Sequence, residues 1–224
     1  MSEGPRILLS EAVQVLDQIR GLWRCPGLEV VGSVRRELPH VGDIEVIAEI
    51  PAMAMRKDAR RQDDPLFAAI NATMHNPWVE DVKGGLFDVR PESQPIEQLP
   101  RIGKAIRGLR PGFRACSLEI DPFHKTIPLQ VYRYTPTNRG WITLMRTGPG
   151  EFGIWFLGQW KKRWMIPPDH QASVDGYLVD RTGKVIDTPD ELTAFRMCGL
   201  EWIPPQSRQR VAEAAMRDKK ELMK

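Results

Sequence analysis

The stretch Val30–Ile50, with the sequence VVGSVRRELPHVGDIEVIAEI, decides the fold that we predict for this chain. An apolar run reaches Gly32-Ser33, and Arg35-Arg36 follows at once. A second run opens at Asp43 and alternates polar with apolar residues, which is typical of a strand with one buried face. The stretch therefore predicts two strands joined by a glycine-serine turn and a basic segment.

The residue types in this stretch predict a reaction on phosphate groups. Asp43 and Glu45 are two positions apart in a strand, so they project from one face, about 6.5–7 Å apart along the chain. Magnesium prefers such hard oxygen ligands. The turn at Gly32-Ser33 offers N–H groups and a hydroxyl to a phosphate, and Arg35-Arg36 offers charged donors. Each feature alone is more often structural, but together they indicate metal-dependent phosphoryl transfer.

Elsewhere the periodicity predicts an α+β fold with no internal repeat. The segment 138–165 is helical and aromatic, with a Gly-Pro-Gly interruption, and Thr188–Glu191 resembles a capping box that opens a short helix. Residues 206–222 form a charged helix, while 83–112 is rich in glycine and proline and is expected to be loop. We predict strands at Leu28–Val31, Asp43–Ile50, Arg114–Ile120 and Ile127–Tyr134.

The composition limits the classes of protein to which this chain can belong. With 224 residues, of which 42% are hydrophobic and 27% charged, the chain can form one domain or two small ones with a real core. It contains no apolar segment of 18 residues, and its three cysteines match no zinc or redox spacing; the polar start of the sequence leads us to expect no signal peptide. We expect a monomer without membrane association, in the cytoplasm of a bacterium or a phage-infected host cell.

The basic residues are concentrated in the middle of the chain. Residues 100–150 contain nine lysines and arginines against two acids, a local charge of +7, whereas the whole chain carries +3. Such asymmetry favours a polyanion partner, although solvated loops also collect cations. If DNA binds, we expect contacts to its phosphates from Arg101, Lys104, Arg107, Arg110 and Arg114.

Three segments, in order, resemble the DNA polymerase X family, the DNA polymerase beta-like enzymes. The first is Gly32-Ser33-x-Arg35-Arg36-x6-Asp43-x-Glu45. The second is Tyr134-Thr135-Pro136, then Trp141-Ile142-x-x-Met145-Arg146-Thr147-Gly148-x-x-x-Phe152. The third, Cys198-Gly199-Leu200-x-Trp202-Ile203-Pro204-Pro205-x-x-Arg208, is similar to the "LGLPYIPPELR" end of many members. The resemblance covers about residues 28–208.

The resemblance implies a nucleotidyltransferase fold and a DNA polymerase activity. The fold would be a palm over residues 1–137, a small mixed sheet with helices on one face, then a small α+β thumb over 138–208 and a helical tail over 209–224. Asp43 and Glu45 would be catalytic and hold Mg²⁺ or Mn²⁺, and the partners would be a nucleoside triphosphate and primed or gapped DNA. The nucleotide-binding residues would be Gly32, Ser33, Arg35, Arg36, Gly42, Arg146, Thr147 and Gly148.

One catalytic position departs from the family. Members carry a third aspartate on the palm strand that leads to the thumb, and alignment through Thr135-Pro136 places Gln130 there. Glutamine is neutral and a poor magnesium ligand. If a hairpin pairs Gln130 with Ser117, and Glu119 with Pro128, then Glu119 lies diagonally from Gln130 and could supply the missing carboxylate. The alternative is that Glu119 is an ordinary solvent-facing strand residue.

Three functions therefore remain open from the sequence. The first is addition of nucleotides to a DNA primer 3′-hydroxyl. The second is a catalytically impaired module that binds nucleotide or DNA, because Gln130 replaces a carboxylate. The third is a nucleotidyltransferase that acts on an acceptor other than DNA.

Overall fold

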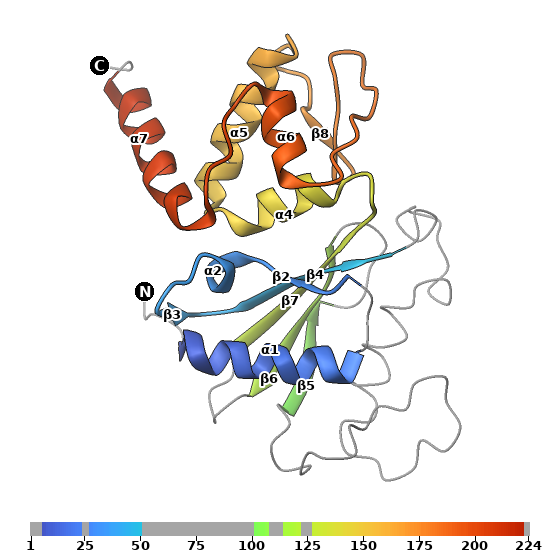
Figure 1. Ribbon diagram of the computed structural model, residues 1–224, viewed down its shortest axis with the longest axis vertical. Coiled ribbons are helices and arrows are strands. Elements are labelled where there is room, and N and C mark those ends of the chain that lie inside the picture. Colours follow the sequence, from blue (N-terminus) through green and yellow to red (C-terminus); the bar gives the residue numbers. More distant parts are fainter. Residues whose placement is uncertain (1–5, 24–26, 51–100, 108–113, 122–126, 222–224) are drawn as a thin grey trace. The chain divides into compact units, whose positions relative to one another are not determined.

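The computed structural model describes residues 6–23, 27–50, 101–107, 114–121 and 127–221, which form two compact units (Figure 1). Unit 1 comprises described residues within 1–30 and 38–133, and unit 2 those within 31–37 and 134–224. The described chain has six α-helices, one five-stranded sheet and two two-stranded sheets. The predicted α+β class is confirmed. No helix in these described ranges is long and apolar enough to cross a membrane.

Unit 1 is built on the five-stranded sheet, in the order β2-β4-β7-β6-β5. Adjacent pairs β2/β4, β5/β6 and β6/β7 are antiparallel, and β1 pairs separately with β3. The strands are β1 (Ile7–Leu8), β2 (Glu29–Val30), β3 (His40–Val41), β4 (Ile44–Glu49), β5 (Arg101–Arg107), β6 (Arg114–Asp121) and β7 (Ile127–Tyr134).

The core of unit 1 follows the periodicities of the sequence. In β4, Ile44, Val46 and Ala48 are fully buried, as expected for one face of a strand. Helix α1 (Leu9–Trp23) contacts β1 and β3, and its residues Ala12, Val15, Leu16 and Ile19 are buried at helical spacing. Burial of these side chains holds the sheet and helix together.

The predicted hairpin register is confirmed, and one predicted loop is wrong. Gln130 pairs with Ser117, and Pro128 pairs with Glu119, as the hairpin assumed from the sequence requires. Residues 101–107, expected within a loop, instead form the edge strand β5, which pairs with β6. Its register shifts between Ile102 and Ala105 and again before Arg107. These irregularities interrupt the regular alternation of a strand, which is why the sequence pattern did not indicate one here.

Unit 2 is mainly helical with one small hairpin. Its helices are α2 (Gly32–Arg35), α4 (Arg139–Thr147), α5 (Gly150–Arg163), α6 (Glu191–Cys198) and α7 (Arg208–Glu221), with a hairpin of β8 (Ser173–Val174) and β9 (Tyr177–Leu178) (Figure 1). Helices α4 and α5 fall in the segment 138–165 that was predicted to be helical and aromatic. Phe156 and Phe195 meet edge to face at 5.4 Å, and Trp141 lies 5.8 Å from Phe156. These buried rings join α4, α5 and α6.

The start of α6 differs from the predicted capping box. Asp190, not Thr188, is the N-cap, and its carboxylate accepts from the backbone N–H of Thr193 at 2.7 Å. Thr188 is buried, and its carbonyl accepts from the N–H of Gly140 at 2.7 Å. Because Asp190 caps the helix, Glu191 is not used as a capping residue, and its side chain is 7% exposed.

Candidate functional site

The two predicted metal ligands lie at the start of β4 in unit 1. Asp43 immediately precedes the strand and Glu45 is its second residue, with the buried Ile44 between them. Both carboxylates are half-buried, because alternate residues of the strand face opposite sides of the sheet. By this alternation Asp43 and Glu45 share one face, on which the next residue, Ile47, is fully buried.

Gln130 lies beside this carboxylate pair. Strand β7 is the neighbour of β4 in the sheet, and the Gln130 Nε2 donates a hydrogen bond to Asp43 Oδ2 at 2.9 Å. The Gln130 Oε1 accepts from the hydroxyl of Tyr132, which is fully buried. The residue aligned with the third carboxylate is thus adjacent to Asp43, and it presents an amide donor in place of an oxygen.

The carboxylates Asp43 and Glu45 are the type of ligand that a hard divalent cation prefers. Asp43 and Glu45 supply carboxylate oxygens, which suit magnesium or manganese, while Gln130 turns its N–H to Asp43. Among the described side chains, no group of three or more histidines, cysteines or acids is placed to hold a metal ion. The side chain of Glu119 lies outside the described part. Gly42 precedes Asp43 and is exposed, and a Cβ added at Gly42 would lie 4.0 Å from the Cγ of Arg6.

The glycine-serine turn belongs to unit 2 and requires its glycine. Gly32 has φ +67°, a left-handed conformation that side chains with a Cβ disfavour. The next residues form the single helical turn α2, closed by a hydrogen bond from the Arg36 N–H to the Gly32 carbonyl at 3.2 Å. The Ser33 hydroxyl oxygen is buried and has no hydrogen-bond partner among the described residues. This turn aims Arg35 and Arg36 at α4.

The two arginines contact the second motif, more than 100 residues along the chain. Arg35 Nη1 donates to the Thr147 hydroxyl at 2.6 Å, and Arg36 Nη1 donates to the Thr147 carbonyl, also at 2.6 Å. Thr147 is fully buried at the end of α4, where Gly148 is the C-cap. The preceding residue, Arg146, is half-buried in the same turn. Residues that the sequence assigned to nucleotide binding from two separate motifs therefore meet in unit 2.

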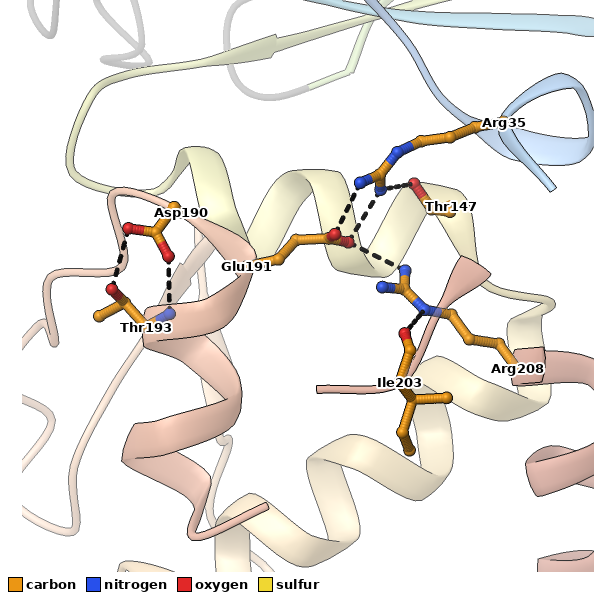
Figure 2. Close-up of polar contacts among 7 residues, drawn as sticks. All are labelled: Arg35, Thr147, Asp190, Glu191, Thr193, Ile203 and Arg208. Carbon is orange, nitrogen blue, oxygen red and sulfur yellow. Dashed lines mark hydrogen bonds and ion pairs between the residues drawn. The ribbon is translucent and has the colours of Figure 1, made fainter. Parts of the chain in front are cut away.

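A buried glutamate joins these residues to the third motif (Figure 2). Arg35 makes two parallel hydrogen bonds to the Glu191 carboxylate, at 2.9 and 2.7 Å. Arg208, which is fully buried, donates to the same carboxylate at 2.9 Å and to the Ile203 carbonyl at 3.1 Å. We call Arg35, Thr147, Glu191 and Arg208 the arginine–glutamate cluster. It connects all three segments that carry the family resemblance.

The charges of the arginine–glutamate cluster support one another. Burial alone would raise the pKa of the Glu191 carboxyl, but hydrogen bonds and positive charges from Arg35 and Arg208 outweigh it and hold that pKa below its ordinary value. Burial lowers the pKa of Arg208, and Glu191 opposes this. The Arg208 guanidinium also lies over the Phe152 and Phe195 rings, at 5.3 and 5.7 Å from their centroids. Glu191 is therefore an ionised, buried anchor.

Sequence reasoning missed Glu191 and Tyr132. Glu191 follows the N-cap in a first turn, where acids are common for reasons of helix stability, so its long-range partners left no local trace. Arg208 carried the available signal, because an arginine after Pro204-Pro205 was part of the third motif. Tyr132 is one of three apolar or aromatic positions that surround Gln130 in β7, and the alternation indicated only a strand.

The predicted DNA-contacting cations can be placed only by their strands. Arg101, Lys104 and Arg107 are on the edge strand β5, and Arg114 begins β6. Arg110 lies outside the described residues, and for the other four only the backbone is described. Strand β5 is the edge of the five-stranded sheet and β6 is its neighbour, and contact of these cations with DNA stays a prediction.

Each unit offers a different chemistry. In unit 1 two carboxylates can hold one hard cation, with an amide beside them. In unit 2 the arginines are already committed to Thr147 and Glu191, so they position the glycine-serine turn as well as offering positive charge. In comparisons with protein families and with curated proteins, no family model and no curated protein matches the chain.

Proposed function

We propose that this protein is a metal-dependent nucleotidyltransferase of the DNA polymerase X type, which adds nucleotides to the 3′-hydroxyl of a DNA primer. The main observation in support is the arginine–glutamate cluster, in which residues from the three segments that resemble the family meet around Glu191. Arg35, Thr147 and Arg208 come from segments that had been identified separately by their sequence, and Glu191 bonds two of these residues directly. Their association is what the proposed function requires, and a chance match of short motifs does not require it.

Each unit has a role in the proposed reaction. Asp43 and Glu45 hold Mg²⁺ or Mn²⁺, which neutralises charge on the transferring phosphoryl group. The turn at Gly32-Ser33 binds the triphosphate, and the unpartnered Ser33 hydroxyl is a donor for its oxygens. Thr147 and Gly148 lie beside the sugar of the incoming nucleotide in the proposed complex. The cations of β5 and β6 contact DNA phosphates, which makes binding dependent on salt.

A second candidate function is a module that binds nucleotide without efficient transfer. It is favoured by one observation, the hydrogen bond from Gln130 to Asp43, because an amide cannot take the proton of a primer hydroxyl or bind a cation as a carboxylate does. Primer extension on gapped DNA, with Mg²⁺ and with Mn²⁺, separates the two candidates. The polymerase proposal expects incorporation, and it expects Asp43→Asn to reduce the rate at least 100-fold.

Two variants sharpen this experiment. Gln130→Asp should raise the rate if a missing carboxylate limits transfer, whereas Glu213→Gln, an exposed change on α7, should leave it unchanged. A folded protein that incorporates no nucleotide with either metal would contradict the polymerase proposal. Triphosphate binding without turnover, together with gain of turnover in Gln130→Asp, would establish the second candidate.

A further inference from the structure

The buried side chain of Asn138 joins the segment before α4 to the β8–β9 hairpin. Asn138 is the N-cap of α4, where asparagine commonly accepts from the first helical turn, but within the described chain its side chain makes no such bond. Its Oδ1 accepts instead from the backbone N–H of Thr135 at 2.7 Å, and its Nδ2 donates to the Gly176 carbonyl at 3.0 Å. An N–H can only donate and a carbonyl can only accept, so both contacts fix the same orientation of the amide. Helix capping therefore does not explain this fully buried asparagine.

Other contacts fix the first turn of α4 in the same place. The Gly140 N–H donates to the Thr188 carbonyl, and the Thr188 N–H donates to the Thr137 carbonyl, both at 2.7 Å. The indole N–H of Trp141 donates to the Ser173 hydroxyl at 3.0 Å. The start of α4 is thus bonded both to the segment before α6 and to the hairpin.

The other end of α4 carries the contacts to the arginines. Thr147, the last residue of α4, accepts from Arg35 at its hydroxyl and from Arg36 at its carbonyl, both at 2.6 Å. The Arg36 N–H in turn closes α2 on the Gly32 carbonyl. A short hydrogen-bonded helix is stiff, so the position of its first turn determines where its last residue lies. All these residues belong to unit 2.

We propose that Asn138 is a positioning residue: its amide fixes the start of α4, so that Thr147 meets Arg35 and Arg36 and holds the Gly32-Ser33 turn in place. Asn138 lies between the two parts of the second motif, and no part of the sequence argument gave it a role. The inference rests on the proposed function only in its consequence for a triphosphate. The positioning of the turn is a property of unit 2 that can be measured without any ligand.

Amide hydrogen exchange of the ¹⁵N-labelled protein tests the positioning directly. The probes are the N–H groups of Arg36 and Glu37, which are bonded within the turn at 3.2 and 2.9 Å. In Asn138→Ala their exchange should become about fivefold faster relative to α5, which corresponds to one neutral hydrogen bond. The α5 amides report any loss of stability of the whole unit, and a purely local role would change exchange only around Asn138 and in the hairpin.

Asp180→Ala is the matched control. The Asp180 carboxylate also organises a turn of unit 2, because it accepts from the Thr182 N–H and hydroxyl and from the Lys184 N–H. Its loss should accelerate exchange in that turn and leave the Arg36 and Glu37 amides unchanged relative to α5.

The consequence for the proposed substrate is measured with dTTP and Mg²⁺. Asn138→Ala should raise the Kd for dTTP about fivefold, because the turn that binds the triphosphate is held less firmly. In primer extension it should raise KM for dTTP and change kcat less than twofold, since the carboxylates Asp43 and Glu45 belong to unit 1. Asp180→Ala should change neither constant.

The outcomes separate this inference from the proposed function. Unchanged exchange of the Arg36 and Glu37 amides in folded Asn138→Ala would overturn the inference, whatever the protein binds. Faster exchange in a protein whose wild type binds no dTTP would support the positioning role and contradict the proposed nucleotide site. Faster exchange with an unchanged Kd for dTTP would overturn the consequence for the triphosphate.

A second variant keeps the test decisive should Asn138→Ala not fold, which near-ultraviolet circular dichroism checks. The double change Tyr177→Phe with Ser173→Ala leaves the Asn138 amide in place but removes the hairpin hydroxyls that contact Thr135 and Trp141. It should also accelerate exchange of the Arg36 amide relative to α5, and no change there would overturn the inference.

Discussion

At the scale of single residues, Glu191 is the most consequential side chain in unit 2. It is buried, it accepts from two arginines, and those arginines come from opposite ends of the sequence. A buried ion pair is not by itself stabilising relative to an apolar pair, but the loss of one partner leaves a charge unpaired in a dry site. The stability of unit 2 should therefore be unusually sensitive to this carboxylate.

Glu191→Gln should lower the free energy of unfolding by about 3 kcal/mol at pH 7, because it leaves Arg208 buried without a counter-charge. The folded pKa of Glu191 is lowered, so its stabilisation is present above the unfolded pKa of about 4.3 and is lost as pH falls through the folded value. The difference between wild type and variant should thus shrink below about pH 4.

Urea unfolding between pH 3 and pH 7 measures this, followed by tryptophan fluorescence. Five of the seven tryptophans lie in unit 2, at positions 141, 155, 160, 164 and 202. Glu213→Gln is the control, since Glu213 is exposed and bonds only Gln209 among the contacts described for it; its effect should stay within about 0.5 kcal/mol. A pH-independent difference in Glu191→Gln would contradict the ionised state that we assign.

At the scale of elements, the packing of α4 against the segment before α6 depends on one glycine. A Cβ on Gly140 would lie 2.0 Å from the Asp190 carbonyl oxygen and 2.8 Å from that of Thr188. Both contacts are with backbone, which cannot move as a flexible side chain does. The N–H of Gly140 also donates to the Thr188 carbonyl, so α4 and the segment before α6 are in contact through their main chains.

Gly140→Ala should therefore cost at least 1–3 kcal/mol, even though alanine favours helices. Gly158→Ala, on α5, is the control, because nothing lies within 4 Å of its Cβ; it should be neutral or stabilise by about 0.5–1 kcal/mol. Thermal unfolding of both variants gives the comparison. Equal melting temperatures would show that α4 and the segment near Asp190 do not pack as described.

The elements also show what sequence reasoning can reach. The pairing of Gln130 with Ser117 followed once the two strands were assumed to form a hairpin with a short connection, and the structure has this register. Strand β5 was not, since its bulges hide the period of two. In the site, the alignment predicted that Gln130 takes the place of a carboxylate, whereas the partners of Glu191 lie 17 and 156 residues away and leave no local pattern.

At the scale of the whole molecule, residues 31–37 are part of unit 2 although both flanking segments belong to unit 1. The division predicted at residue 137 placed this segment with the first unit, and palm and thumb remain predictions. Residues 31–37 are therefore joined along the chain to unit 1 on both sides, but they pack as part of unit 2. Arg35 is the residue through which its packing can be probed, by its bonds to Thr147 and Glu191.

Arg35→Met should accelerate amide hydrogen exchange in α4 and α6, by about five- to thirtyfold, and leave β4 and β7 unchanged. This corresponds to about 1–2 kcal/mol, a reduced value because the Arg35 side chain is 26% exposed. Arg20→Met, which breaks an exposed pair with Asp17 on α1, should alter neither set. Faster exchange in β4 and β7 to the same extent would argue against the assignment of residues 31–37 to unit 2.

The early position of residues 31–37 has a consequence for synthesis on the ribosome. Arg35 is made 156 residues before Glu191, so at about 5–20 residues per second it waits roughly 8–30 seconds for its partner. Unit 2 cannot reach its final packing until Glu191 and Arg208 have been translated. During this interval Arg35 is a cation on a nascent polypeptide without its Glu191 partner.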